Sequence, residues 1–340
     1  AMLFLILKKP RFGSALALVC IVAAAQYAGY IAVGDQYLLS GSETPGQGIY
    51  TLSEIAEPTL EAAAQPDFKD WRRIDYGKKI RNYGLLRGAS SLTSFMSLRA
   101  STVGRFVSMA GFGYDESTTV CPPNDSAALR AFLSVTEYYK IDDSPVPEGF
   151  VFDREENGIP VYTNPNAVPM GFLQTTCTGT HHQRMDSETV PTVMLAAVTL
   201  EDDALEKYGD RMAKLDVYAI PDWRESVARL KENACDSFEI FANGFTAKID
   251  AKDAGMLVFT LPFDKGFSAT VDGQKAEIVN CDVAFMGVFV ETGAHEIVFT
   301  YHTRSLTIGV VMSLLAAGML IVYCAAAKAM MKKKPSGCKS

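Results

Sequence analysis

The chain of 340 residues is acidic, with 39 Asp and Glu against 32 Lys and Arg and a formal net charge of −7. Without a basic patch, this balance argues against nucleic-acid binding, which needs Lys and Arg side chains against the phosphates. Hydrophobic residues make up 48% of the chain, but the longest apolar runs are two uninterrupted blocks. This concentration is typical of a membrane protein rather than a soluble one.

The first apolar block, Phe12–Val33, contains no charged side chain. It is long enough to cross a hydrocarbon core of about 30 Å as a helix. We therefore predict a cytoplasmic stub at residues 1–11 and a transmembrane helix at 12–34. A secretory signal peptide is the alternative, because basic residues precede the block and small residues lie inside it, although the block is longer than a typical signal core. The apolar run Met2–Leu7 resembles the end of a longer segment, so we expect a truncated chain.

Residues 35–234 predict a mixed region of helices, strands and loops. In Asp125–Tyr139 apolar residues recur at helical spacing behind an Asp suited to an N-cap, and a strand follows. Asn157-Gly158 lies between alternating arms and predicts a hairpin. Trp223–Leu230 predicts an amphipathic helix with its apolar face turned inward.

From Cys235 onward the apolar period changes from helical to two residues. Six β-type runs follow one another, separated mostly by Asn-Gly, Asp-Gly and Thr-Gly turns. We predict that residues 235–304 form an antiparallel β-sandwich. The fold class predicted for the chain is therefore two transmembrane helices flanking an extracytoplasmic α+β region that ends in this sandwich.

The second apolar block, residues 305–327, is free of charge and rich in Leu, Ile, Val and Met, and predicts the second transmembrane helix. A basic tail at 328–340 follows it. Basic residues flank cytoplasmic ends, so we predict a multi-pass protein of the cell membrane with both termini in the cytoplasm and residues 35–304 outside. The flanking residues are Lys8, Lys9, Arg11, Lys328, Lys332, Lys333 and Lys334.

The seven cysteines divide by compartment. Four lie in the outer segment and allow three disulfide pairings, between which the sequence does not choose; they are Cys121, Cys177, Cys235 and Cys281. No CxxC or Cys/His spacing connects them, so we predict no zinc site. Cys20, Cys324 and Cys338 lie in the spans or the tail.

Four segments, in order, resemble the YfhO family of bacterial membrane proteins. The strongest is LPFDKGFSATVDGQKAEI, followed by DVAFMGVFVETGAHEIVFTYH and an apolar helix. Upstream, RIDYGKKIRNYGLLRGASSLTSFMSL, LRAFLSVTEYYKI and VYTNPNAVPMGFL are similar to earlier parts of that family. The four blocks cover most of residues 71–325, and the resemblance is to the family's C-terminal portion.

The resemblance implies a GT-C-class glycosyltransferase that uses a polyprenyl-phosphate-linked sugar to decorate cell-surface glycopolymers such as teichoic acids. In that class the catalytic acid lies in an outer loop after the first of many spans, whereas the two spans predicted here correspond to the last ones. No catalytic residue is therefore carried over, and no cofactor is expected. The chain is expected to be either a C-terminal fragment or a reduced relative that has lost catalysis.

The candidate ligand-binding residues lie in the first of the four blocks. Asp75, Arg81, Asn82 and Arg87 supply the carboxylate, amide and guanidinium groups that bind hydroxyls or phosphates. Tyr76 and Tyr83 are nearby as sugar-stacking faces. The alternative role for these polar residues is to fix a loop by hydrogen bonds.

Three other groups are weaker candidates. His181 and His182, with Asp186 and Glu188, invite a metal interpretation but match no metal-site spacing. Asp264 in PFDKGF fits an ordinary turn with Lys265 and Gly266. Ser91 and Ser94 lack a G-x-S-x-G context and an activating His, so we interpret them as structural hydroxyls.

The preferred function is the C-terminal part of a YfhO-like membrane glycosyltransferase, whose outer domain assists binding of the acceptor polymer. The alternative is a non-catalytic, two-helix carbohydrate-binding or assembly module, in which exposed aromatics such as Trp71, Tyr83 and Trp223 would matter most. A surface sensor is a further alternative, but the short cytoplasmic ends leave little room for a partner.

Overall fold

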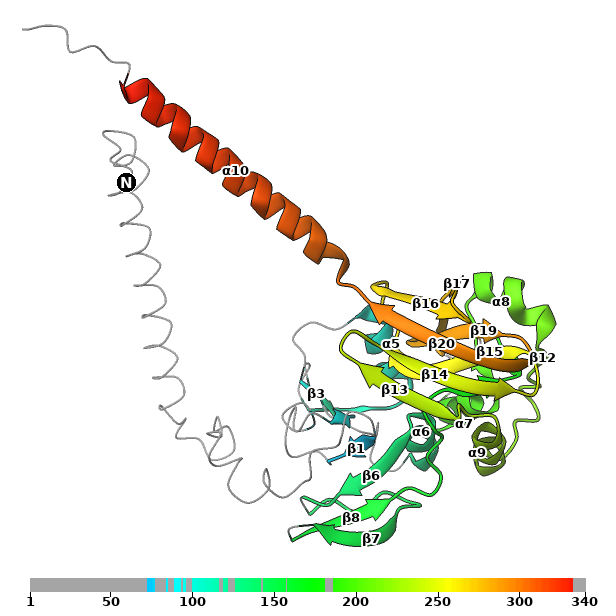
Figure 1. Ribbon diagram of the computed structural model, residues 1–340. Coiled ribbons are helices and arrows are strands. Elements are labelled where there is room, and N and C mark those ends of the chain that lie inside the picture. The colour runs from blue at the N-terminus through cyan, green and yellow to red at the C-terminus, as the bar shows by residue number, and fades with distance from the viewer. Residues whose placement is uncertain are drawn as a thin grey trace, which may run out of the picture. The chain divides into compact units, whose positions relative to one another are not determined.

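The computed structural model describes residues 72–76, 84, 89–92, 94–95, 100–115, 119–121, 126–141, 143–156, 158–180 and 186–332. The chain divides into two units, Pro58–His302 and the terminal segments, and the long helix α10 belongs to the second. The first predicted span, at 12–34, lies outside the described residues. Figure 1 shows the elements, which form the mixed α+β architecture expected from the sequence.

Two antiparallel sheets form most of the C-terminal half of the first unit. The first has the strand order β13-β14-β20-β16-β17. Its strands are Ser237–Phe241 (β13), Gly244–Ala251 (β14), Phe267–Val271 (β16), Gln274–Ala276 (β17) and Gly293–Tyr301 (β20). The second has the order β18-β19-β15-β9. Its strands are Phe172–Gln174 (β9), Gly255–Pro262 (β15), Val279–Cys281 (β18) and Phe285–Val290 (β19).

The two sheets share one apolar core, as in a sandwich. Alternate residues of β14, such as Phe245 and Ile249, are buried against Leu257 and Phe259 of β15 and Val288 of β19. The phenyl rings of Phe245 and Phe299 stack at a centroid separation of 4.5 Å. The period of two read from the sequence after Cys235 therefore corresponds to strands with one buried face.

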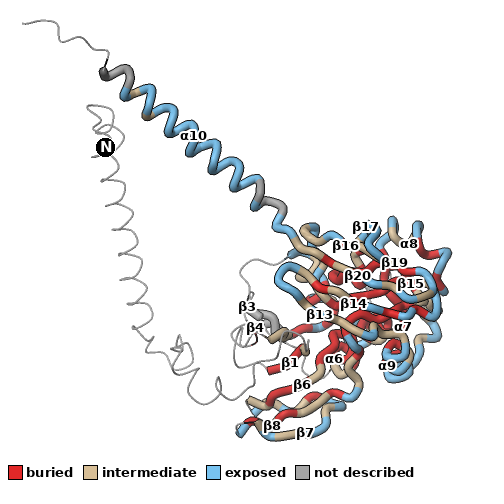
Figure 2. Tube along the Cα trace, viewed as in Figure 1, coloured by how far each residue is buried: buried red, intermediate tan, exposed pale blue. Residues whose placement is uncertain are grey.

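The second sheet is buried on both faces. Met256 and Val258 of β15 point away from the sandwich core into a second core, which helices α6, α7 and α9 line. These helices are Ala127–Phe132 (α6), Thr189–Ala196 (α7) and Trp223–Glu232 (α9). Strand β9, from upstream of Cys235, joins this sheet beside β15. The sandwich and the helical region are thus joined by a common middle sheet, which Figure 2 shows as buried (red) tube between them.

A third sheet, of order β2-β1-β6-β8-β7, lies at the N-terminal end of the described unit. Its strands are Arg73–Asp75 (β1), Ser90–Ser91 (β2), Val135–Tyr139 (β6), Val151–Glu156 (β7) and Ile159–Thr163 (β8). The hairpin of β7 and β8 confirms the Asn157-Gly158 prediction, since Gly158 takes a φ of +83°. Arg73 ties this sheet to the middle one: its guanidinium donates to the carbonyl oxygens of Leu133 and Thr260, the latter at 2.9 Å.

The remaining elements are short. Two small sheets have the orders β11-β10-β12 and β3-β5-β4. Their strands are Ser94–Phe95 (β3), Gly113–Asp115 (β4), Thr119–Cys121 (β5), Thr176–Thr178 (β10), Val198–Thr199 (β11) and Ala213–Lys214 (β12). The helices not yet named are Ser101–Met109 (α5), Asp202–Tyr208 (α8) and the 3-10 turn Gly209–Arg211.

Two predicted helices are confirmed. Helix α6 begins one residue later than expected: Ser126, not Asp125, caps it, with the Ser126 hydroxyl accepting from the Leu129 amide at 3.2 Å. Helix α9 buries Val227 and Leu230, as the apolar spacing predicts.

Helix α10 spans Arg304–Lys332. Within it, Ile308–Lys328 is long and apolar enough to cross a membrane, and none of this segment is buried by the protein itself, as the pale blue tube in Figure 2 shows. A helix of this length with apolar side chains on every side fits a lipid environment.

Candidate functional site

Asp75, the first predicted ligand-binding residue, lies at the end of β1 and is completely buried. Its carboxylate accepts a hydrogen bond from Arg130 Nε of α6 at 3.0 Å, and the Arg130 side chain is only 4% exposed. A buried charge is tolerated only with such a partner. In this structure Asp75 therefore pairs with Arg130 inside the fold, and its role in ligand binding stays a prediction.

The other three predicted ligand-binding residues, Arg81, Asn82 and Arg87, lie outside the described residues, as does Tyr83. Their role therefore stays a prediction. Tyr76 is buried, with its ring 5.5 Å from that of Tyr139. It therefore presents no stacking face to a sugar in this structure.

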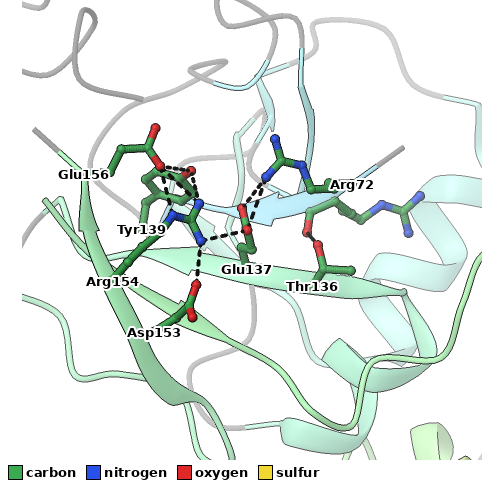
Figure 3. Close-up of polar contacts among 8 residues, drawn as sticks. Arg72, Thr136, Glu137, Tyr139, Asp153, Arg154 and Glu156 are labelled. Atoms are coloured by element: carbon green, nitrogen blue, oxygen red, sulfur yellow. Dashed lines mark hydrogen bonds and ion pairs between the residues drawn. The ribbon is translucent and has the colours of Figure 1, made fainter. Parts of the chain in front are cut away.

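A network of arginines and carboxylates connects strands β6 and β7, which lie on either side of β8 in the third sheet (Figure 3). Arg72 reaches both oxygens of Glu137 at 3.3 Å, and Arg154 reaches Glu137 at 3.2 Å and Glu156 at 3.1 Å. The Tyr139 hydroxyl donates to Glu156 at 3.0 Å. Burial raises the pKa of Tyr139, and the charges of Glu137 and Glu156 add to this effect. In this network each arginine forms an ion pair with a carboxylate, and these pairs connect β7 to β6.

A cleft of about 510 Å³ opens between helices α5, α6, α7 and α9. Three of these helices, α6, α7 and α9, present their first turns to it, and α5 contributes the residues just after its C-terminus. The lining residues are Ala110, Gly111, Ser126, Ala127, Ala128, Glu148, Ser187, Glu188, Thr192, Trp223 and Arg224. It combines an aromatic ring, hydroxyls and carboxylates in a volume typical of ligand sites.

Trp223 forms the aromatic part of this cleft. It is half-buried, with its indole packed against the helical core, which corrects the expectation of an exposed ring. The Arg224 guanidinium carbon lies 4.4 Å from the ring centroid, and Arg224 Nη2 donates to Glu148 Oε1 at 3.3 Å. Because Arg224 and Glu148 are both exposed, this ion pair contributes at most about 1 kcal/mol.

Backbone amides at the start of α7 and α9 are already satisfied by carboxylates. Asp186 Oδ1 accepts from the amides of Glu188 and Thr189 at 3.1 and 2.8 Å, and these bonds, Thr189 first, lower the pKa of Asp186. Asp222 Oδ1 accepts from the Arg224 amide at 2.9 Å. Each of these helix ends therefore already has a carboxylate bonded to an amide, which offsets part of its positive charge.

The residues that were weaker candidates for metal binding or catalysis lie in turns and strands where the structure describes them. Asp264 Oδ1 accepts from the Gly266 amide at 2.6 Å, the hydrogen bond of an Asx turn. Ser91 lies on β2 and Ser94 on β3. His181 and His182 lie outside the described residues, and Asp186 caps α7 instead. Among the residues that the structure describes, no group of three His, Cys, Asp or Glu is placed to hold a metal.

Three of the four cysteines between residues 35 and 304 have described side chains, and all three are free thiols. Cys177 and Cys281 are completely buried, and burial raises the pKa of Cys235 to about 12. A raised pKa keeps a cysteine protonated, and the protonated thiol is unreactive. No disulfide joins these three cysteines to one another, and the side chain of Cys121 lies outside the description.

Sequence reasoning singled out Trp223 and Glu188 but not the cleft that contains them. Glu148, Ser126 and Gly111 come from separate segments, and no spacing in the sequence connects them. The one available signal was Trp223 at the start of an amphipathic helix.

Residues 212–313 match the family described as "Bacterial membrane protein YfhO". This segment is similar to the C-terminal portion of the YfhO family. The match confirms the predicted resemblance for the C-terminal portion, and it includes α9 with Trp223 and Arg224, strands β13 to β20 and the beginning of α10. The match to a membrane-protein family and the apolar helix at Ile308–Lys328 together support association of the chain with a lipid bilayer. No curated protein and no solved structure matches the chain.

Proposed function

We propose that this chain forms the C-terminal part of a YfhO-like membrane glycosyltransferase. The donor is a polyprenyl-phosphate-linked sugar and the acceptor a teichoic-acid-type polymer of the cell surface. The outer domain assists binding of the acceptor. The observation that carries the proposal is the YfhO match over residues 212–313, combined with the family's implied GT-C chemistry.

The cleft beside α9 supports the acceptor-binding part of this proposal. It lies partly within the matched segment, through Trp223 and Arg224. Aromatic rings and carboxylates are the groups that bind the apolar faces and the hydroxyls of sugars. The acceptor-binding part of the proposal therefore rests on these groups of the cleft and not on the sandwich fold.

The membrane arrangement proposed with this function has both termini in the cytoplasm and residues 35–304 outside. Residues 12–34 and 305–327 form the two spans of this segment. The outer location places the cleft where cell-surface polymers are assembled. The basic residues beside both spans support this orientation.

Deletion of the gene in its host, followed by sugar analysis of the purified wall polymers, tests the transferase proposal. We expect loss of one sugar substituent, restored by the intact gene. Membranes from the complemented strain should also transfer labelled sugar from a polyprenyl phosphate donor to the stripped polymer. Unchanged polymer composition in the deletion strain would contradict the proposal.

The second candidate function is a non-catalytic carbohydrate-binding or assembly module. It is favoured by the pairing of carboxylates with arginines in the described polar clusters: Asp75 with Arg130, Glu137 with Arg154 and Glu148 with Arg224. Carboxylates held in this way are placed for packing or for accepting hydrogen bonds. Binding of the polymer without any sugar transfer by the complemented membranes would favour this candidate.

A further inference from the structure

We infer that the cleft between α5, α6, α7 and α9 binds neutral sugar units of a glycopolymer and does not bind its phosphate groups. This inference rests on the proposed function, which it deepens by naming the recognised chemistry. It is carried by three features of the cleft: the Trp223 ring, the carboxylates on the rim and the occupied helix ends.

The Trp223 ring supplies a platform for a sugar ring. Its position at the first residue of α9 is fixed, because the half-buried side chain packs against the helical core. The other contact is the Arg224 guanidinium, which lies over the ring and is exposed. An exposed side chain in a weak ion pair is displaced at low cost, so the sugar takes the place of Arg224 on the ring.

The carboxylates of Glu148 and Glu188 supply acceptors for sugar hydroxyls. Both are exposed and both line the cleft. Ionised carboxylates accept only, and hydrogen bonds from hydroxyls to them are stronger than neutral ones. Displacement of Arg224 also frees Glu148 from its ion pair with that residue. Ser187 and Thr192 add hydroxyls to the same wall.

Phosphate is excluded by the same groups. Helix N-termini ordinarily attract anions, and α7 and α9 both begin at this cleft. Here Asp186 accepts from the Thr189 amide of α7 and Asp222 from the Arg224 amide of α9, and Glu148 and Glu188 add negative charge to the rim. A phosphate would therefore meet carboxylates in place of free amides, which repels it.

Intrinsic fluorescence of the full chain in detergent tests the inference. The protein has two tryptophans, so Trp71→Phe leaves Trp223 as the single reporter in the cleft. We expect saturable changes in its emission with neutral oligosaccharides, maltoheptaose and chitotetraose being the probes, and none with inorganic phosphate or glycerol 3-phosphate at equal ionic strength. Saturable binding of either phosphate probe, or no change with both oligosaccharides, would overturn the inference.

A variant at the rim of the cleft shows whether the oligosaccharide binds in the cleft or changes the fluorescence in some other way. In the Trp71→Phe background, Glu188→Ala should weaken the apparent affinity for the oligosaccharide about tenfold, the order expected when a hydrogen bond to a charged group is lost. Glu188 makes no side-chain capping bond to α7, so this variant should fold. Glu206→Ala, an exposed glutamate on α8 outside the cleft, is the matched control and should leave affinity unchanged. Equal affinity for both variants would show that the sugar binds elsewhere.

The two proposals fail in different ways. If the complemented membranes transfer sugar but Trp223 does not respond to the oligosaccharides, the assigned cleft is wrong and the transferase proposal stands. If Trp223 responds and Glu188→Ala weakens binding, but deletion of the gene leaves wall sugars unchanged, the cleft assignment stands and the transferase proposal is wrong.

Discussion

Asp75 and Arg130 form an ion pair inside the protein, and their burial makes this pair important for stability. Their side chains are 0% and 4% exposed and 3.0 Å apart. Breaking a buried ion pair by removing one partner typically costs about 3–5 kcal/mol, whereas replacing both partners costs less. The pair therefore holds β1 against α6 only while both charges are present.

We expect Arg130→Met to lower the free energy of unfolding by about 3–5 kcal/mol, as measured by urea titration of the purified chain in detergent. The double variant Asp75→Asn with Arg130→Met should recover part of that loss. Lys248→Met, which removes an exposed ion pair with Glu296, is the control and should cost less than about 1 kcal/mol. A loss for Arg130→Met no larger than that of the control would contradict the structural role.

Asp282 is a buried acid at the turn between β18 and β19. It is completely buried, and its carboxylate accepts from the Thr199 amide at 2.9 Å. Burial raises the pKa of Asp282 to about 7, against the opposing effect of the Thr199 hydrogen bonds. The folded protein then binds a proton more tightly than the unfolded chain, whose Asp pKa is about 3.9. Stability from this group is present at low pH and is lost as the pH rises from about 4 to about 7.

Asp282→Asn should remove this pH dependence while keeping an acceptor for the Thr199 amide. Asn also tolerates the φ of +48° at this position. We expect the variant to match the parent at about pH 4 and to exceed it at about pH 8, by roughly 4 kcal/mol at most. Thermal unfolding of both proteins at the two pH values measures the difference. A difference that does not change with pH would contradict the buried, ionising carboxyl.

At the scale of elements, two glycines of the sandwich are required for different reasons. A Cβ on Gly244, at the start of β14, would lie 1.9 Å from the Phe299 carbonyl oxygen of β20. A Cβ on Gly273 would meet nothing within 4 Å, but this residue has a φ of +76° in the turn before β17. The first glycine allows two strands to approach, and the second allows the chain to turn.

Gly244→Ala should therefore destabilise the protein more than Gly273→Ala does. The clash requires movement of β14 against β20 and should cost about 3 kcal/mol or more, whereas the strained φ should cost about 1–2 kcal/mol. Urea titrations of the two variants supply the comparison. Equal losses, or a larger loss for Gly273→Ala, would show that β14 and β20 pair less closely than described.

At the scale of the whole molecule, the proposed orientation predicts which residues are reachable from outside the cell. Tyr218 is 96% exposed in the outer unit, and Cys338 lies in the basic tail beyond α10. In intact cells, a membrane-impermeant maleimide should label Tyr218→Cys combined with Cys338→Ser. The parent protein should be labelled at Cys338 only after permeabilisation, because its thiol lies inside. The opposite pattern would invert the proposed topology.

The sequence by itself determined the elements whose patterns are local. The uncharged run from 305 to 327 predicts α10 because a lipid environment accepts apolar side chains on every face. The alternation after Cys235 predicts the strands because one face of each is buried, and the spacing of Val227 and Leu230 predicts α9 for the same reason. The family resemblance of this C-terminal portion could likewise be read from its residues.

Only the tertiary structure decided which distant segments meet. It placed β9 beside β15, made the second sheet a middle layer between two cores, buried Asp75 against Arg130, and formed the cleft at Trp223 from five separate segments. None of these follows from periodicity, because pairing between remote segments depends on how whole faces pack and not on the pattern within any one segment. The same packing removes water from Asp282 and thereby raises its pKa.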